Sequence, residues 1–399
     1  MAMKISKIVD ALEPSATIAM ATKAGELKDK GETVFSLSLG EPDFNTPEHI
    51  QAAAYEAMQS GFTHYTPAGG IPALKQAIAD DYEKRYGIKY EKSQIVASNG
   101  AKHSLHNVFT VLCNPGDEVI IPAPYWVSYS EIVKLTGAVP VIVPTEQENN
   151  FKLTPEAFKA AVTDKTTILL LCSPSNPTGS MYTPEELGAL ADVAIECDLT
   201  VVADEIYDHL VYPGYEFASF PTVREGLADR TVLVNGVSKT YAMTGWRIGW
   251  TLSPAPIAKA MNSLQSQETS CPCSVSQKAA IAALNGPQEC VGEMLTAFTE
   301  RKEYVQKRIA DIPGLSCPEM AGAFYAFINI KAYLNKTYNG VEVKNSTDWC
   351  LTLLDQQKVA SVMGVAFGAE GYARFSFATS LENLEAAFDR VAAFCANAK

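Results

Sequence analysis

Between about residue 90 and about residue 253 the chain alternates short apolar runs with amphipathic stretches, and this alternation most restricts its fold. The apolar runs lie at residues 117–122, 139–144, 166–172, 200–205 and 231–236. A helix is predicted after Thr183, an N-cap residue with Pro184 in the first turn and Glu186 three positions on. Strands that alternate with helices form a mostly parallel sheet covered on both faces. The sequence therefore predicts an α/β protein.

The C-terminal part has a different pattern and predicts a smaller α+β domain. A long charged helix around residues 298–312 precedes an apolar segment at 322–330, a helix at 346–357, a strand at 372–379 and a closing helix. We expect an N-terminal segment, 1–45, that packs with this small domain, a large domain at 46–290 and the small domain at 291–399. No internal repeat or low-complexity linker interrupts this organisation.

The charge balance excludes several classes of partner. The chain has 399 residues, 32 of them basic and 45 acidic, and a formal net charge of −13. Binding to nucleic acid or to an anionic membrane would require a basic stripe, and the sequence has none. An anionic ligand must therefore be held by a few cations gathered at one site.

The nine cysteines are scattered, mostly in apolar runs, as expected of reduced thiols in a cytosolic protein. No metal site is predicted, because Cys271 and Cys273 lack further ligands at a suitable spacing and no carboxylate is expected near His103 and His106. No apolar run approaches the roughly 20 residues that span a bilayer, and the first residues lack the apolar core of a signal peptide. We expect a cytoplasmic protein that binds neither membranes nor nucleic acid.

Lys239 is the most unusual charged residue. It lies in "NGVSKTYAMTGWRIGW" (235–250), among small and apolar residues, with Arg247 eight positions on. This setting suggests burial, and a buried ammonium sheds its proton to give the neutral amine that reacts with aldehydes. The alternative is a lysine at a strand end whose ammonium reaches solvent. This stretch alone does not decide between them.

Two further polar groups follow predicted strands. "CSPSNPTG" ends a strand in a loop that presents Asn176, although a simple turn explains the same residues. "VVADEIYDHL" ends a strand with Asp204 and places Tyr207 three residues later. A carboxylate at the end of an apolar strand needs a cation, and a protonated pyridine nitrogen would serve. Because ligands bind at the carboxyl ends of such strands, Asn176, Asp204 and Lys239 are expected to share one site.

Together these motifs resemble the class I aminotransferases of fold type I, which use pyridoxal 5′-phosphate. The lysine signature of that family is matched at Gly236, Ser238, Lys239, Ala242, Met243, Gly245, Arg247 and Gly249. The resemblance runs nearly end to end, through "PSAT", "GEPDFNTPEHI", "HYTPAGGIPALKQAI", "SNGAK", "PAPYWVSY", "SPSNPTG", "ADEIY", "GAFYAF" and "ARFSFATS" in the expected order. It implies a large domain with a seven-stranded, mostly parallel sheet between helices, and a smaller α+β domain.

The resemblance implies three catalytic residues, Lys239, Asp204 and Tyr207, and a binding residue, Asn176. Lys239 would bind the cofactor aldehyde covalently and later carry the proton of the substrate α-carbon. Asp204 would pair with the ring nitrogen, and Asn176 and Tyr207 would donate hydrogen bonds to the phenolic oxygen of the ring. Protonation of the ring makes it a better electron sink.

The same resemblance assigns the other cofactor contacts. Ser238 and Arg247 would hold the phosphate, together with the N–H groups of Gly100 and Ala101 at the start of a helix, where anions bind. Trp126 would stack on the ring, although in isolation it could be a core residue.

Substrate contacts and assembly are also implied. Arg374 resembles the clamp for the α-carboxylate, for which a surface salt bridge is the alternative, and Gly40 gives that carboxylate room at the backbone. Lys102 and Thr17 resemble the pair that contacts the distal carboxylate of a dicarboxylic substrate. Tyr65 resembles the tyrosine that reaches the phosphate of a neighbouring subunit, which implies a homodimer with shared sites.

Within the family the chain is most similar to bacterial aspartate aminotransferases and aspartate/prephenate aminotransferases. This implies ping-pong transfer of an amino group from aspartate or glutamate to a 2-oxo acid, namely 2-oxoglutarate or oxaloacetate, with prephenate as a further candidate. Three features depart from the family pattern: Met363 replaces a frequent proline, Phe377 replaces a frequent tyrosine, and residues 266–277 differ from the common version.

Other functions remain as alternatives. The same scaffold supports aromatic or alanine aminotransferases and β-lyases, which cofactor motifs do not exclude. A regulator with an aminotransferase-like domain would need a DNA-binding module, and we expect none because the resemblance begins within the first 20 residues. A dinucleotide dehydrogenase or a P-loop nucleotidase would need glycine-rich motifs that the sequence lacks.

Overall fold

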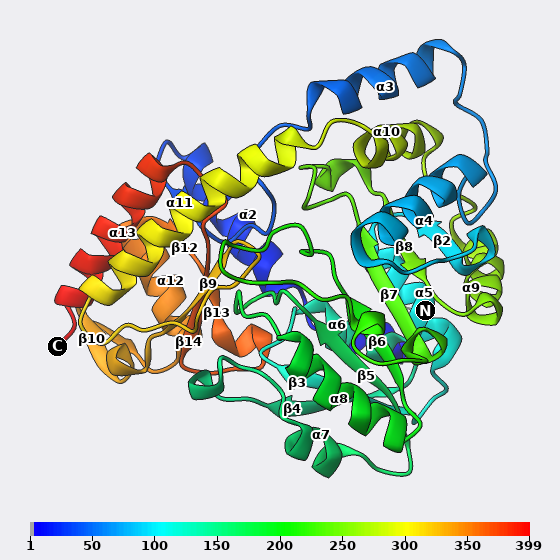
Figure 1. Cartoon of the computed structure of the whole chain (residues 1–399). Coiled ribbons are helices and arrows are strands. Elements are labelled where there is room, and N and C mark those ends of the chain that lie inside the picture. Colours follow the sequence, from blue (N-terminus) through cyan, green and yellow to red (C-terminus); the bar gives the residue numbers. More distant parts are fainter. Residues whose placement is uncertain (1–3) are drawn as a thin grey trace.

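The computed structural model describes residues 4–399, and its largest element is a seven-stranded sheet (Figure 1). The strands run in the order β2-β8-β7-β6-β5-β3-β4, and only the pairs that β8 makes are antiparallel. Their bounds are β2 (Ile95–Ser98), β3 (Glu118–Ala123), β4 (Val139–Pro144), β5 (Thr166–Cys172), β6 (Thr200–Asp204), β7 (Thr231–Gly236) and β8 (Gly249–Leu252). All of the predicted strands are present. The prediction missed β2 and β8, each of four residues.

Helices cover both faces of this sheet, because successive side chains of each strand point to opposite faces. Leu169 and Leu171 of β5 belong to one buried core, and Ile168 and Leu170 belong to the other. The first core contains residues of α3 (Glu48–Gln59), α4 (Pro72–Tyr86), α7 (Pro155–Ala161), α8 (Pro184–Glu196) and α10 (Ser274–Asn285). The second contains residues of α5 (Ala101–Leu112), α6 (Ser128–Leu135) and α9 (Ala255–Glu268). We call this sheet and its helices the large unit.

A third core joins the C-terminal part of the chain to its N-terminal segment, and we call this part the small unit. Its three-stranded antiparallel sheet has the order β13-β14-β9. The strands of the whole small unit, three of which form this sheet, are β9 (Tyr325–Asn329), β10 (Lys336–Tyr338), β11 (Val341–Val343), β12 (Val359–Ala360), β13 (Val362–Met363) and β14 (Tyr372–Ser376). The helices are α11 (Glu289–Asp311), α12 (Ser346–Gln357) and α13 (Leu381–Ala396).

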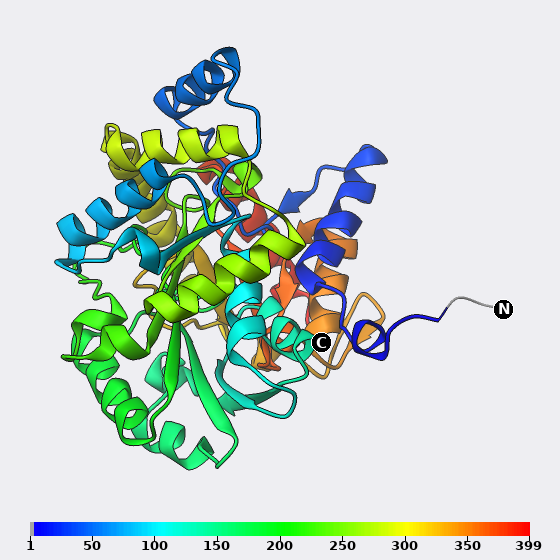
Figure 2. The same ribbon diagram turned by 90° about the vertical axis from the view of Figure 1, so that its right-hand side faces the viewer.

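The N-terminal segment packs on the small unit. Met20 and Ala24 of α2 (Ala16–Asp29) lie in its core, and β1 (Phe35–Ser36) pairs with β12. The short helix α1 (Lys7–Asp10) projects from the side of the molecule (Figure 2). The domain limits given above stay a prediction, and the second of them falls inside the first turn of α11.

Two general features accompany this fold. Across residues 4–399, no helix is both long and apolar enough to cross a membrane. None of the nine cysteines, all within the described range, forms a disulfide.

The capping box predicted at the start of α8 is confirmed. The hydroxyl of Thr183 accepts from the Glu186 N–H at 3.2 Å, and the Thr183 N–H donates to the Glu186 carboxylate at 2.7 Å. These two bonds satisfy backbone donors that the first turn of a helix leaves free.

A buried ionic network supports the carboxyl ends of β6 and β7. Asp208 accepts hydrogen bonds from Arg85 at 2.9 Å, Tyr86 at 2.8 Å and Asn235 at 2.9 Å, and so ties α4 to both strand ends. Glu205 lies beside it, 3 % exposed, and accepts from Ser219 and from the backbone N–H of residue 220. Burial, opposed by these donors, raises the pKa of Glu205 to about 8.

We predict that Glu205→Gln removes part of the pH dependence of stability. The folded protein keeps the Glu205 proton up to about pH 8, whereas the unfolded chain releases it near its ordinary pKa of 4.5. Wild-type stability should therefore fall as pH rises through this window, and the variant should be spared roughly 1–3 kcal/mol of that loss. Unfolding curves at several pH values measure it, and parallel pH profiles for the two proteins would contradict it.

Candidate active site

A cavity of about 290 Å³ lies at the carboxyl edge of the large sheet, where the small unit meets it. The predicted site residues line it, apart from Gly100 and Tyr65: Thr17, Gly40, Ala101, Lys102, Trp126, Asn176, Asp204, Tyr207, Ser238, Lys239, Arg247 and Arg374. The ends of β5, β6 and β7 with the loops that follow them, the start of α5 and the segment before α6 supply residues from the large unit. The strands β9 and β14 and the N-terminal segment supply the others. The rule that ligands bind at this edge brought these side chains together correctly.

Lys239 presents its amine inside this cavity. Its Nζ donates to the carbonyl oxygen of Gly40 at 2.5 Å. Desolvation lowers the pKa of Lys239 to about 8, and the cations Arg247 and Arg374 act in the same direction. Near neutral pH a useful fraction of the amine is therefore unprotonated and nucleophilic.

Asp204 is a buried carboxylate, 4 % exposed, at the end of β6. Its Oδ2 accepts from the Tyr129 hydroxyl at 2.6 Å, and its Oδ1 accepts from the Ile206 N–H at 3.2 Å. Burial raises the pKa of Asp204 to about 6, against the effect of these donors. A cation on the cavity side would keep the carboxylate ionised.

Tyr129 is a site residue that sequence reasoning missed. It follows Trp126 by three residues, and the two rings meet edge to face at 5.3 Å between centroids. The spacing, which puts both side chains on one side of a helical turn, was the signal that could have identified it. Trp126 lines the cavity and is not a residue of the closed core.

Arg374 is the most constrained cation of the site. It is 1 % exposed, and its guanidinium lies over the rings of Tyr325 at 4.6 Å and Phe367 at 5.0 Å. It donates to Asn176 Oδ1 at 2.9 Å and to the carbonyl oxygen of Ser38 at 2.6 Å. Within residues 4–399 no carboxylate forms a salt bridge with it, and its Nε is buried without a hydrogen-bond partner. The alternative of a surface salt bridge is therefore wrong.

The start of α5 provides N–H groups for an anion, although the set differs from the predicted one. The helix begins at Ala101, and the N–H groups of Ala101 and Lys102 lie in its free first turn. The N–H of Gly100, which we expected to contribute, instead donates to the carbonyl oxygen of Ser98 at 2.8 Å. An anion at this helix start would therefore be held by the N–H groups of Ala101 and Lys102 and not by that of Gly100.

Arg247 borders the same helix start. It donates to the carbonyl oxygens of Thr244 at 2.9 Å and Asn99 at 3.3 Å, and its own backbone is left-handed, with φ 56°. Gly100 has φ 86°, and a Cβ there would lie 2.8 Å from Cζ of Arg247. The glycine is therefore needed both for its backbone angle and for the close approach of the guanidinium.

Two further polar groups that line the cavity have no hydrogen-bond or salt-bridge partner among the described residues. Among the described residues, the Thr17 hydroxyl is buried without a hydrogen bond. Lys102 has its Nζ 4.9 Å from the Trp126 ring centre, and no salt bridge to it occurs between residues 4 and 399. Desolvation, with Arg247, lowers the pKa of Lys102. An anionic or hydroxylated ligand would satisfy both groups.

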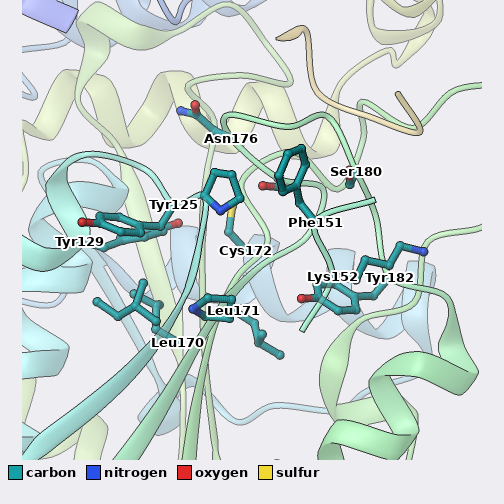
Figure 3. A pocket seen from close by; sticks show the side chains of 14 residues that line it. Tyr125, Tyr129, Phe151, Lys152, Leu170, Leu171, Cys172, Asn176, Ser180 and Tyr182 are labelled. Atoms are coloured by element: carbon teal, nitrogen blue, oxygen red, sulfur yellow. The ribbon is translucent and has the colours of Figure 1, made fainter. Parts of the chain in front are cut away.

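A smaller cavity of about 30 Å³ shares part of its lining with the main cavity, and Figure 3 shows the side chains around it. Tyr129, Cys172 and Asn176 line both cavities. Ser180 lines the smaller one, and its hydroxyl is buried without a partner in the described part of the chain. The volume suits a water molecule, which would satisfy that hydroxyl.

Two expectations concern residues outside the cavity. Tyr65 is 91 % exposed and makes no contribution to the site of its own chain.

A carboxylate does lie near the histidine pair, contrary to our expectation: Glu268 is 3.2 Å from His106 and 3.6 Å from His103. Among residues 4–399, no group of three or more ligating side chains could hold a metal ion.

A lysine amine, a buried carboxylate and unpaired cations around one cavity of an α/β fold define an enzyme site for a small anionic ligand. The chain belongs to the class I and II aminotransferase family, whose model matches residues 32–391. It is an aminotransferase, and both the predicted family and the predicted fold class are confirmed.

Relatives match the whole chain. It is 47 % identical to the aspartate aminotransferase of Bacillus subtilis, over 98 % of this chain and 99 % of that protein. It is 44 % identical to the aspartate/prephenate aminotransferase of Nitrosomonas europaea, again over 98 % and 99 %. The aspartate aminotransferase structure from Rhizobium meliloti superposes with a TM-score of 0.96, 40 % identity and 100 % coverage of both chains. That from Thermus thermophilus with maleate gives 0.93 and 38 %, covering 98 % of this chain and 100 % of that one.

We predict that Gly100→Ala weakens anion binding at the start of α5 by about tenfold, an estimate equal to about 1.4 kcal/mol. The new methyl group displaces Arg247, and the positive φ adds strain. Gly116→Ala is the matched control, because its φ is also positive, 91°, but nothing lies within 4 Å of the added atom. Titration with inorganic phosphate measures the effect. Equal losses in both variants would mean that backbone strain, and not Arg247, is responsible.

Proposed function

We propose that this aminotransferase uses pyridoxal 5′-phosphate to move an amino group between aspartate or glutamate and a 2-oxo acid, in a ping-pong reaction. The observation that carries the proposal is Arg374, a buried cation that has no carboxylate partner among the described residues and faces the same cavity as Lys239. A buried charge is costly without a counter-charge, so the site favours a carboxylate ligand beside the amine.

The donor set of the cavity fits the cofactor. Lys239 offers an amine for its aldehyde, and Asp204 offers a buried carboxylate for its ring nitrogen. Ser238, Arg247 and the first N–H groups of α5 would hold the phosphate. When bound, pyridoxal phosphate supplies an electron sink for the charge that develops at the substrate α-carbon.

The protein's own groups perform the remaining tasks. With a pKa of about 8, Nζ of Lys239 can accept a proton and return it near neutral pH, as a general base and then a general acid. Tyr129 holds Asp204 in place by its 2.6 Å hydrogen bond. Asn176 uses its oxygen to accept from Arg374, which leaves its amide N–H groups to donate toward the cavity. Tyr207 offers a hydroxyl beside it.

Substrate selection would rest on two carboxylate sites. Arg374, with its geometry fixed by two aromatic rings and two acceptors, suits the α-carboxylate, and Gly40 leaves space beside it. Lys102 and Thr17 suit a distal carboxylate. The names of the relatives and the maleate, a dicarboxylate, in the Thermus thermophilus structure support this choice.

The reach of Lys102 favours several acidic substrates over one. A flexible ammonium meets carboxylates at different distances, whereas a guanidinium fork fixes one geometry. We therefore propose aspartate and glutamate as donors, oxaloacetate and 2-oxoglutarate as acceptors, and prephenate as a further acceptor, because some relatives bear that name.

We also propose a homodimer that acts in the cytoplasm. Tyr65, on the surface of its own chain, would complete the phosphate site of the partner subunit. Large apolar side chains are exposed nearby in sequence, such as Tyr55 at 60 % and Met58 at 50 %, and on the projecting N-terminal segment (Figure 2), such as Ile5 at 70 %. A second copy of the chain would cover them. The unpaired cysteines agree with a reducing compartment.

The role of Lys239 is tested by Lys239→Ala. The purified wild type should be yellow with cofactor bound, and borohydride should fix the cofactor to the chain. The variant should still bind cofactor but retain none after borohydride and denaturation, and its turnover should drop by several orders of magnitude because the proton carrier is lost. Lys102→Met serves as the control that keeps the covalent link. Near-normal turnover in Lys239→Ala would exclude this assignment.

The distal site is tested by Lys102→Met in half-reactions with single substrates, followed by absorbance. The change should weaken transition-state binding of aspartate and glutamate by about 1.5–3 kcal/mol, the range for a hydrogen bond to a charged group. Alanine and phenylalanine, which lack a distal carboxylate, should react almost as before. A uniform loss across acidic and neutral substrates would place Lys102 in the cofactor site, and the substrate assignment would be withdrawn.

A further inference from the structure

Tyr325, the tyrosine of the "GAFYAF" motif, contacts both halves of the proposed chemistry, although the sequence analysis gave it no role. Its ring lies under the guanidinium of Arg374 at 4.6 Å, and its hydroxyl is 2.8 Å from the hydroxyl of Tyr207. Both tyrosines are buried, and both line the main cavity. One side chain thus joins the cation of the substrate end to the hydroxyl of the cofactor end.

The sheet register of the small unit fixes this position. Tyr325 is the first residue of β9 and pairs with Ser376 of β14, while Arg374 pairs with Phe327. Residues two apart on a strand share a face, so Arg374 lies diagonally across from Tyr325 on the cavity side.

Gly40 leaves room for the Tyr325 hydroxyl. A Cβ at position 40 would lie 2.7 Å from that oxygen. The hydroxyl therefore lies between Gly40 and Tyr207. Tyr207 follows β6 of the large sheet, and Tyr325 begins β9 of the small unit.

The chemistry of two phenols determines the direction of the bond between them. Each hydroxyl has one proton to donate, and Tyr207 is the only acceptor that the Tyr325 hydroxyl has among the described residues. If Tyr207 donates into the cavity, toward an anionic oxygen, its own oxygen is free to accept from Tyr325. Such a chain is favoured because a hydrogen bond to a charged acceptor is the stronger one, and each donor polarises the next.

We propose that Tyr325 is a positioning residue that acts through Tyr207. Its hydroxyl donates to Tyr207 and so directs the Tyr207 proton to the phenolic oxygen of the cofactor, and its ring keeps Arg374 in place for the α-carboxylate. This inference rests on the proposed function. It assigns separate tasks to the two parts of the side chain, which can be removed separately.

Tyr325→Phe removes only the hydroxyl. The hydrogen bond from Tyr207 to the deprotonated form of the bound cofactor is then weaker. The pH midpoint of the visible absorbance change should therefore rise by about 0.3–0.8 pH units. Turnover should fall, while KM for aspartate stays within about threefold because the ring still supports Arg374. Tyr338→Phe is the control: it removes a buried hydroxyl that donates to the Tyr333 carbonyl, away from the cavity, and should leave the midpoint unchanged.

A double-variant cycle decides whether Tyr325 acts through Tyr207. Tyr207→Phe should raise the midpoint more than Tyr325→Phe does, and adding Tyr325→Phe to Tyr207→Phe should move it no further. The same additional shift in both backgrounds, or no shift in Tyr325→Phe, would overturn the proposal. Tyr325→Leu, which removes the ring, should raise KM for aspartate and for alanine alike, since both carry an α-carboxylate, and unchanged KM values would overturn the second task.

The wild type separates this inference from the proposed function. A wild type that shows no pH-dependent absorbance with added cofactor would refute the proposed function itself. If the wild type shows such a midpoint and Tyr325→Phe has the same midpoint, only the role of Tyr325 is refuted.

Discussion

The site depends on a buried cation that the described part of the chain does not neutralise. Arg374 is held by two aromatic rings, the Asn176 side chain and a backbone carbonyl, none of which carries a negative charge. In a chain with a net charge of −13, carboxylates are abundant, yet among residues 4–399 none forms a salt bridge with it. Its desolvation is an unfavourable term in the folded protein that an anionic ligand relieves. Physical chemistry alone therefore favours an anionic ligand in this cavity.

The large unit contributes the other half of the site through its topology. Parallel strands bring β5, β6 and β7 to a common edge, so residues 28 and 35 positions apart in the chain, Asn176, Asp204 and Lys239, become neighbours. The network around Asp208 anchors α4 to the ends of β6 and β7 just behind that edge. Stability and function are therefore coupled, because the same strand ends that carry the site are fixed by buried ionic contacts.

Much of this could be predicted from the sequence, for identifiable reasons. The strands β5, β6 and β7 are buried on both faces and are therefore continuous apolar runs in the sequence. A polar residue at the end of such a run is easy to recognise. The strands β2 and β8 were not predicted, because each has only four residues, some of them polar or glycine, and so forms no such run. Tyr129 and Tyr325 escaped because an aromatic residue in an apolar segment has the same appearance whether its hydroxyl faces a core or a cavity. The Gly100 N–H was misassigned because only the coordinates reveal its turn to Ser98.

The placement of the cavity's cations gives the charge that a complete ligand set must carry. Arg247 and Lys102 lie at the start of α5, with Lys102 beside Trp126, and Arg374 comes from β14 of the small unit. Lys239 is partly neutral near pH 7, and Asp204 faces the position proposed for the cofactor ring nitrogen. A phosphate, an α-carboxylate and a distal carboxylate together supply one anion for each cation. A monocarboxylic substrate would leave the ammonium of Lys102 without a partner in a desolvated position, and this cost is the physical argument for the proposed dicarboxylic substrates.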